Sequence, residues 1–454
     1  SIQETAKLFG QTIFFWVMTT SLLAYTIQKQ GLAKRYALFF LSIPGVASST
    51  YRLLFFYMLV TGFLSWFVSD ASTIALMMPL GLSLQSCIRT LTRPAVNEAG
   101  ADALVALPVD VPPQSLVATA TVAAPSGVQP LALDKAQSPL ASFFALGTLY
   151  AAVAGGVATI AGAPHNAVAI AQLEAVADVT LGWFSWMMVG VPIFFTVLVL
   201  SYLLLLLFFK PEIRDIPGVR EFLREERKKL GRMTLGEKNV LVVFLVTVSL
   251  FTLPPVLPTL LGDQHPFSQW LDNVMSIWLV APIVLILLFS LPTDLRKGEL
   301  LLNWKEAAAR TPWHILLMVT SAVGMTDALA DFGFMDIVTN SIKGANLSAA
   351  ALPFFAGVVT SVSTNFISGV AATSVYTSML IPVAQHIGLN PASIAIIVPC
   401  AAVGLTFPWA GPTVATAFGF GEISLRDLIR VGILAQVIMV TVAATYCLIF
   451  APIL

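Results

Sequence analysis

The stretch SWFVSDASTIALMMPL, residues 65–80, decides how the surrounding chain can fold. Its polar centre, SDAST at 69–73, interrupts sequence that is otherwise strongly apolar. Too little apolar sequence lies on either side for two ordinary membrane-spanning helices, because each needs about 20 residues. The pattern therefore predicts a hairpin over 53–86 that turns inside an apolar environment, with a carboxylate and three hydroxyls at its tip.

The composition places this hairpin in a membrane. Of 454 residues, 57% are hydrophobic and 11% charged, whereas soluble domains carry about 25% charged residues. The long apolar runs predict an all-α polytopic protein, since a β-barrel would show alternating segments of about 10 residues. The zero formal net charge argues against nucleic-acid binding. The three cysteines show no metal-binding spacing, and no GxSxG, HExxH, Walker or GxGxxG motif indicates an enzyme or an ATP-driven pump.

The apolar segments repeat in order along the chain. Each half has a long helix with Thr-Ser at its centre (20–21 and 320–321), a polar-tipped hairpin, a broken helix and a closing helix. The breaks are GGVATIAGAPHNAV (155–168) and GLTFPWAGPTVAT (404–416), where Gly and Pro stop a helix. Paired broken segments in two halves are typical of transporters whose site lies at the membrane midplane.

These correspondences predict the organisation of the chain. The first repeat is expected at 1–208, an amphipathic cytoplasmic linker at 209–238 and the second repeat at 239–454. Within the repeats we expect, in order, a hairpin at 53–86, a cytoplasmic insertion at 96–137, a broken helix at 139–180, scaffold helices at 239–291, a hairpin at 352–385 and a broken helix at 393–416.

The basic residues predict the orientation of the chain. Of 24 Lys and Arg, all except Lys7 and Lys343, hence 22, lie in five segments taken as cytoplasmic loops: 29–52, 87–138, 209–238, 292–312 and 419–430. Cytoplasmic loops of membrane proteins carry such an excess. The helices then alternate only if both polar-tipped segments are re-entrant and the repeats are inverted, with the C-terminus extracytoplasmic. The helices at 239–291 have no counterpart in the first half, so we expect either that further helices precede Ser1 in the natural chain, which the lack of an initiator Met favours, or that the protein has lost them.

The hairpin tips have the chemistry of ion sites. A helix N-terminus offers unpaired N–H groups to an anion, and a helix C-terminus offers carbonyls to a hard cation. Ser65 lies one turn before Ser69, and Gly162 can add a carbonyl from the break. Asp70 is either a cation ligand or an N-cap, and His165 either a titratable coupling group or a pore-lining hydrogen-bonder. For Trp66 and Trp409, hairpin packing is favoured over a substrate cage.

Three stretches carry a resemblance to a known family. QGLAKRYALFFL (30–41) resembles its Gly-Leu-x-x-Arg helix end, NWKEAAARTPWHILLM (303–318) its Trp-Lys/Glu-Glu-Ala…Pro-Trp stretch, and the 155–168 break its Gly-Gly-x-x-Thr-x-x-Gly-x-Pro-Pro-Asn segment. Together they make the chain similar to the divalent anion/sodium symporters, the di- and tricarboxylate and sulfate transporters of the ion transporter superfamily. The resemblance covers the chain apart from 96–137.

This resemblance implies an elevator-type homodimer, in which a transport domain made from both hairpins and both broken helices slides across the bilayer. Each family tip carries Ser-Asn-Thr, which binds a small anionic substrate and helps form a Na⁺ site; no other cofactor is implied. The matching substrate positions here are Ser69, Asp70, Ala71, Ala163, Ser368, Gly369, Val370 and Pro412. The matching cation positions are Ser65, Ser69, Asp70 and Gly162 in the first site, and Thr364, Ile367, Gly369 and Ala410 in the second.

The tips depart from the family pattern. Asp70 replaces the first Asn, Gly369 replaces the second, and both tip threonines are absent. Aligned backwards from Pro382, the second tip falls instead at Thr373-Ser374. An ionised Asp70 repels a dianion unless a cation or a proton neutralises it. Either Na⁺ therefore binds more tightly at the first site, or Asp70 or His165 carries a proton.

The sequence thus predicts a secondary active transporter in the plasma (inner) membrane of a prokaryote-like cell. The predicted activity is Na⁺-coupled uptake of a divalent anion, a C4-dicarboxylate or a citrate-like acid. Within transport, the alternatives are an inorganic anion such as sulfate, or proton-coupled exchange. The alternatives of another class are a passive anion channel and a receptor that binds without transport.

Overall fold

The computed structural model describes residues 12–92, 138–211, 213–214, 216, 218–261, 277–313, 316–317, 321 and 348–450. Within these ranges the chain forms sixteen α-helices, the short 3-10 helix η1 (Val46–Ser48) and one two-stranded sheet of β1 (Pro292–Asp294) and β2 (Glu299–Leu300). The mostly helical character agrees with the sequence-based prediction. The expected insertion at 96–137 and Thr320 of the second Thr-Ser pair lie outside the described residues.

Both polar-tipped hairpins are present. The first consists of α4 (Thr50–Ser65) and α5 (Asp70–Thr92), and the second of α16 (Ala351–Ser363) and α17 (Gly369–His386). The second tip therefore lies at 364–368, and the alternative tip, Thr373-Ser374, lies inside α17. Helix α5 continues six residues beyond the expected end at 86, because 87–92 contain no Gly or Pro to stop it.

Each hairpin is followed by a broken helix and a long closing helix. The first set is α6 (Pro139–Ala158), α7 (Pro164–Ala177) and α8 (Trp183–Phe208). The second set is α18 (Pro391–Ala401), α19 (Pro412–Gly419) and α20 (Leu425–Phe450). All four segments of the broken helices begin with proline, whose missing N–H costs nothing in a first turn.

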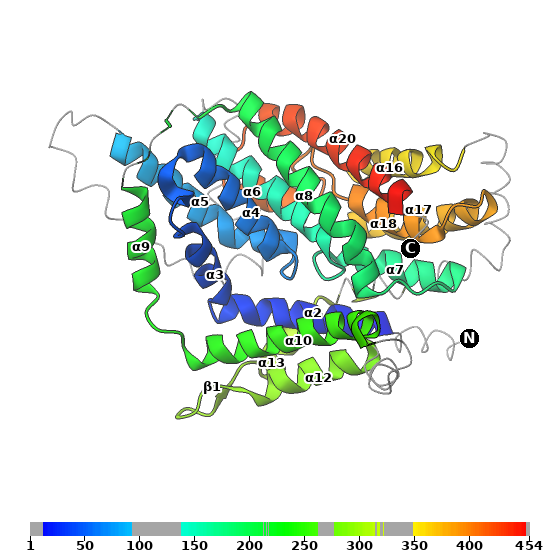
Figure 1. Ribbon diagram of the computed structural model, residues 1–454, viewed down its shortest axis with the longest axis horizontal. Coiled ribbons are helices and arrows are strands. Elements are labelled where there is room, and N and C mark those ends of the chain that lie inside the picture. Colours follow the sequence, from blue (N-terminus) through cyan, green and yellow to red (C-terminus); the bar gives the residue numbers. More distant parts are fainter. Residues whose placement is uncertain are drawn as a thin grey trace, which may run out of the picture.

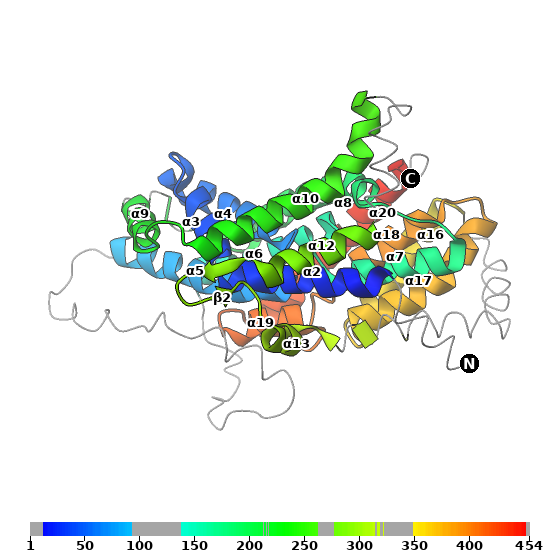
Figure 2. The ribbon, with the colours of Figure 1, turned by 90° about the horizontal axis from the view of Figure 1, so that it is seen from below.

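The two halves exchange their second helical segments. Helix α7 packs on α17 and α18 of the second half, α19 packs on α5 and α6 of the first, and α8 packs on α20. These helices form one body, and α2 (Thr12–Lys29), α10 (Leu235–Leu261), α12 (Ile277–Ser290) and α13 (Trp304–Arg310) form a layer beside it (Figures 1 and 2). The exchange brings each break next to the other half of the body.

Helix α6 is the centre of the first half, with α4, α5 and α8 packed around it. Its apolar window is completely buried. Among the described residues, four helices are long and apolar enough to cross a membrane: α5, α6, α8 and α20. The first arms of both hairpins are apolar but shorter, at 16 residues for α4 and 13 for α16.

The segment expected as a loop at 29–52 contains helix α3 (Leu32–Leu41), which buries Ala33, Ala37, Leu38 and Leu41. These apolar residues have helical spacing, and glycines with positive φ, Gly31 and Gly45, flank the segment that carries them. The segment was predicted to be a loop only because of its positive charge. The expected amphipathic helix of the linker is α9 (Val219–Lys229), which packs on α3. Arg35 of α3 joins the end of α9 to Glu237 of α10.

Helices α4 and α6 cross at two glycines. A Cβ on Gly155 would lie 2.9 Å from Gly62 Cα, which is closer than real carbon contacts. We expect Gly155→Ala to lower the free energy of unfolding by about 1–3 kcal/mol, because backbone must move to admit the methyl group. Gly147→Ala of the same helix is the control, since its Cβ would meet the flexible Met58 side chain at 3.3 Å. Equal thermal unfolding midpoints for the two variants in detergent would contradict this explanation.

Candidate functional site

The first tip holds a buried carboxylate. Asp70 is the first residue of α5 and is only 5% exposed. Its Oδ1 accepts a hydrogen bond of 2.9 Å from Ser65 Oγ, at the end of α4. We expected Ser69 to lie one helical turn after Ser65 on the same helix. This prediction is wrong, because α4 ends at Ser65 and Ser69 instead directly precedes α5. The N-cap position thus falls to Ser69, and the Asp70 carboxylate is held across the tip instead.

Gly156 brings this carboxylate to the first break. A Cβ on Gly156 would lie 2.9 Å from Asp70 Cγ, and a Cβ on Gly162 would lie 2.8 Å from Gly156 Cα. The structure therefore brings Ser65, Asp70 and Gly162 together around a glycine that leaves room for the carboxylate. Larger side chains at 156 would separate these three predicted cation ligands.

The first break is fixed by polar side chains. Asn166 Nδ2 donates to the carbonyls of Gly156 (2.8 Å) and Thr159 (2.9 Å). Thr159 Oγ1 donates to the carbonyl of Trp66 and so ties the break to the tip. Asn166 Oδ1 is buried and has no hydrogen-bond partner. A buried acceptor without a donor is unusual, and a bound cation or water would satisfy it.

The second tip meets its break in a similar way but without a carboxylate. A Cβ on Gly404 would lie 2.6 Å from Thr364 O and 2.7 Å from Ala410 Cβ. Two predicted ligands of the second cation site are thus neighbours around a glycine. Gly369 occupies the position that corresponds to Asp70 in the first half. Gly369 lies against the carbonyl of Ala402, whereas Asp70 lies against Gly156. The second set therefore offers backbone oxygens and no charge.

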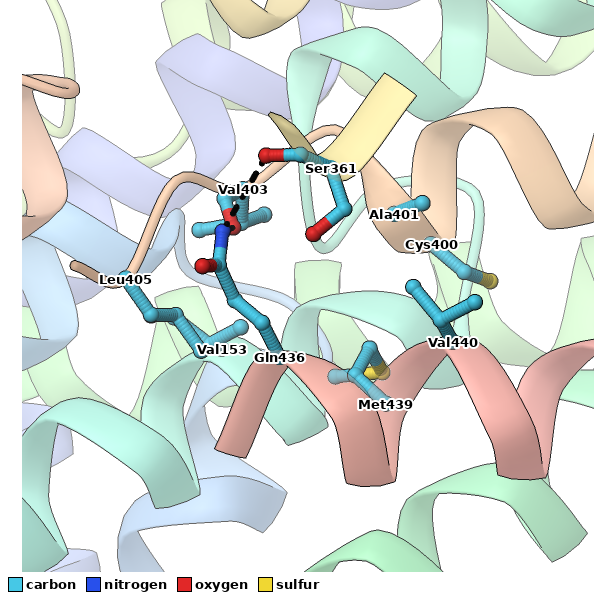
Figure 3. Close-up of a pocket in the computed structure, with 9 residues that line it drawn as sticks. All are labelled: Val153, Ser361, Cys400, Ala401, Val403, Leu405, Gln436, Met439 and Val440. Carbon is cyan, nitrogen blue, oxygen red and sulfur yellow. Dashed lines mark hydrogen bonds between the residues drawn. The ribbon is translucent and has the colours of Figure 1, made fainter. Parts of the chain in front are cut away.

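Gln436 of α20 holds the second break in place. Its Nε2 donates to the carbonyls of Ser361 (3.3 Å) and Val403 (3.4 Å), and its Oε1 accepts from Thr406 Oγ1. Figure 3 shows this side chain pointing from α20 toward Ser361 and Val403. The crevice around it, between α6, α16, α18 and α20, leaves no room for a water molecule. It is therefore a tightly packed contact between helices and not a ligand pocket.

The predicted substrate positions differ in exposure between the halves. Ala163 and Asp70 are buried, and Ser69 and Ala71 are half-buried. Ser368 and Pro412 are exposed, as is Ile367 of the second cation set, while Gly369 and Val370 are half-buried. His165 is the second residue of α7 and is 8% exposed. The first half of the site is thus enclosed, and the second half is open.

A small cavity lies where the helical body meets the neighbouring layer. Its volume is about 20 Å³, enough for one water, and its lining includes Phe67 beside the first tip, Ala161 in the first break and Thr247 of α10. Thr20, half of the first Thr-Ser pair, also lines it. Phe67 contacts Phe244 of α10 edge-on at 4.7 Å between ring centroids. The first tip therefore rests on the layer formed by α2 and α10.

The donor set at the first tip fits a hard monovalent cation. It comprises a carboxylate, hydroxyls and backbone carbonyls, which are oxygen ligands suited to Na⁺. Among the described residues, no three His, Cys, Asp or Glu gather as a transition-metal site requires. Gln436 was not predicted from the sequence, and Gly156 and Thr159 appeared only within the 155–168 stretch, without a role of their own. Asn166 was quoted only within a motif, although an Asn after the break's proline was the available signal.

Comparisons with known proteins agree with this architecture. The family model described as the sodium:sulfate symporter transmembrane region matches residues 1–454. The sodium-dependent dicarboxylate transporter SdcS of Staphylococcus saprophyticus is 24% identical over 451 residues, covering 97% of this chain and 76% of that protein. The sodium-dependent high-affinity dicarboxylate transporter 3 of Caenorhabditis elegans is 26% identical over 453 residues, covering 94% and 72%.

Two solved structures share the fold. MtrF of Neisseria gonorrhoeae has a TM-score of 0.56 at 12% identity, covering all of this chain and 84% of that one. The YdaH transporter of Alcanivorax borkumensis has a TM-score of 0.54 at 12% identity, covering all of this chain and 88% of that one. At this identity the likeness concerns the arrangement of the helices alone.

Proposed function

Because the chain belongs to the family of the sodium:sulfate symporter transmembrane region, we propose that it is a Na⁺-coupled carrier of divalent anions, with C4-dicarboxylates or citrate-like acids as substrates. The chain is an integral membrane transporter and not an enzyme. The observation that supports coupling most directly is the buried Asp70 carboxylate at the first tip, joined to Ser65 and placed against Gly156.

In this proposal the cation binds first. Na⁺ at Asp70, with oxygens of Ser65, Ser69 and Gly162, neutralises a charge that would otherwise repel a dianion. The anion then binds between the two tips, where the N-termini of α5, α7, α17 and α19 offer N–H groups. Binding of either ion therefore strengthens binding of the other by the same factor.

The second site plays a smaller part in this proposal. Thr364, Ile367 and Ala410 can offer backbone carbonyls, and Gly369 adds no side chain. A cation held only by neutral oxygens binds more weakly than one that also contacts a carboxylate. We therefore place the coupling ion that sets the driving force at the first site.

The transport motion that we propose is an elevator movement of the helical body. The body consists of both hairpins, both broken helices and their closing helices, and it moves against the layer of α2, α10 and α12 within a homodimer. Both hairpins are re-entrant and the repeats inverted in this proposal, with the basic loops cytoplasmic. The short first arms α4 and α16 and the exchange of α7 and α19 support it.

The test is uptake of labelled succinate into proteoliposomes under an imposed Na⁺ gradient and, separately, a pH gradient. We expect accumulation above the external concentration with Na⁺, which a passive channel cannot achieve. Accumulation driven only by a pH gradient would show that the coupling ion is a proton, carried by Asp70 or His165, and not Na⁺. Binding without flux would indicate a receptor. If succinate neither binds nor enters, the dicarboxylate assignment fails and sulfate is the next substrate to measure.

A further inference from the structure

Three aromatic side chains gather at the open half of the site. Phe407 and Trp409 lie in the second break, with their rings stacked at 4.9 Å between centroids and 6° between planes. Phe366 lies in the second tip, 6.2 Å from Phe407. Trp409 is 66% exposed and Phe366 74%. Trp409 therefore makes a packing contact, as expected for it, but most of its ring surface remains exposed.

These rings lie beside the proposed substrate positions. Phe366 precedes Ser368 by two residues, and Trp409 is followed by Ala410 and, three positions on, by Pro412. Ser368 and Pro412 are themselves exposed. The Phe366–Phe407 contact joins the tip to the break, so the aromatic group spans the two segments that would hold an anion.

The surroundings of the break argue that these rings face water and not lipid. The break covers 402–411, and the backbone N–H groups of Trp409 and Gly411 donate to no acceptor within the described protein. Irregular backbone at membrane depth survives only where protein buries it or a water-filled cavity solvates it. The two unpaired N–H groups favour a break that water solvates, and aromatic faces beside such a break would be available to a ligand.

Among the described residues, the first half of the site shows no comparable exposed aromatic surface. Trp66 packs on Phe63 at 4.7 Å and Phe194 at 5.5 Å, which is the hairpin packing expected for it. Phe67 packs on Phe244 of α10. The aromatic side chains of the first tip are thus already engaged within the protein, whereas Phe366 and Trp409 are open. The second tip also has Gly369 and Val370 in place of hydrogen-bonding side chains.

We propose that Phe366, Phe407 and Trp409 form an aromatic platform that binds an aromatic ring of the substrate, so that ring-bearing dicarboxylates bind more tightly than bare C4-dicarboxylates. This inference rests on the proposed function, because it places the carboxylates at the helix N-termini between the tips. Stacking of one ring on such a platform is expected to strengthen binding by about 2- to 10-fold.

The test compares 2-phenylsuccinate with succinate, which differ by one ring. Two quantities are measured for the detergent-solubilised protein and for Trp409→Ala: the dissociation constant from ligand-dependent thermal stabilisation, and the concentration that halves Na⁺-driven uptake of labelled succinate. We expect phenylsuccinate to bind more tightly than succinate to the unchanged protein. In Trp409→Ala the ratio of the two affinities should fall toward one.

Trp304→Ala is the matched control, because Trp304 in α13 is also exposed, at 74%, but lies outside the site. It should preserve the affinity ratio. Equal affinities of the two anions for the unchanged protein, or a ratio that Trp409→Ala leaves intact, would overturn the platform while leaving dicarboxylate transport standing. Failure of both anions to bind would instead reject the proposed function, on which the platform depends.

Discussion

Asp70→Ala is expected to weaken the Na⁺ dependence of substrate uptake into proteoliposomes, so that much more Na⁺ is needed to drive it. The carboxylate is the one charged oxygen ligand at the first tip, and it is buried beside Ser65 and Gly156. A hydrogen-bonding or ligand contact to a charged group contributes about 1.5–3 kcal/mol, so cation affinity should fall by about 10- to 100-fold. The measurement is the Na⁺ concentration that gives half-maximal substrate uptake.

Asp70→Asn separates the two coupling mechanisms. It restores the amide of the family pattern and keeps an oxygen ligand but cannot carry a proton. Na⁺-driven uptake in this variant would support a Na⁺ site, whereas loss of all driven uptake would support proton coupling. Ser72→Ala is the control, since Ser72 follows Asp70 by two residues and is no proposed ligand. If Asp70→Ala leaves uptake and its cation dependence intact, Asp70 is not part of the coupling site.

Arg35→Ala is expected to destabilise the protein by roughly 3 kcal/mol, the lower end of the effect for breaking a buried ion pair. Arg35 Nε and Nη2 donate to Glu237 Oε1 and Oε2 at 2.8 and 3.0 Å. Further bonds from Arg35 go to the carbonyls of Leu230 and Gly231 at the end of α9. The Glu237 side chain is 5% exposed, so truncating Arg35 leaves a buried carboxylate that has, among the described residues, no charged partner and only the Thr234 N–H as a hydrogen-bond donor.

Lys29→Ala is the matched comparison. Lys29 pairs with Glu306 at 2.7 Å, but both side chains are about 30% exposed, and exposed pairs contribute about 0–1 kcal/mol. Thermal unfolding in detergent should therefore separate the two variants clearly. Arg35→Lys should also be destabilised, because one ammonium cannot reproduce the forked contact with Glu237 and the two carbonyls. Similar unfolding midpoints for Arg35→Ala and Lys29→Ala would show that burial does not distinguish these pairs.

Much of the fold follows from local properties of the sequence. The polar knot at 69–73 and the Gly and Pro clusters near 162 and 411 separate helices in the structure, because irregular backbone must begin where helix-breaking residues stop the ladder. The amphipathic spacing of 219–229 predicted α9 in the same way. Helix α3 was missed because its positive charge suggested a loop, whereas its apolar spacing gave it a face to bury.

By itself, the sequence determined that the protein is helical and membrane-embedded, that two hairpins precede two broken helices, and that a carboxylate occupies the first tip. Only the tertiary structure decided what surrounds each tip. Gly156 and Asn166 reach the first site, and Gln436 reaches the second break from α20. The physical reason is that hydrophobic spacing fixes which face of a helix is buried, whereas the partners of buried polar groups depend on packing between helices far apart in the chain. The same packing leaves Trp409 open at the second break while it encloses Asp70 at the first tip.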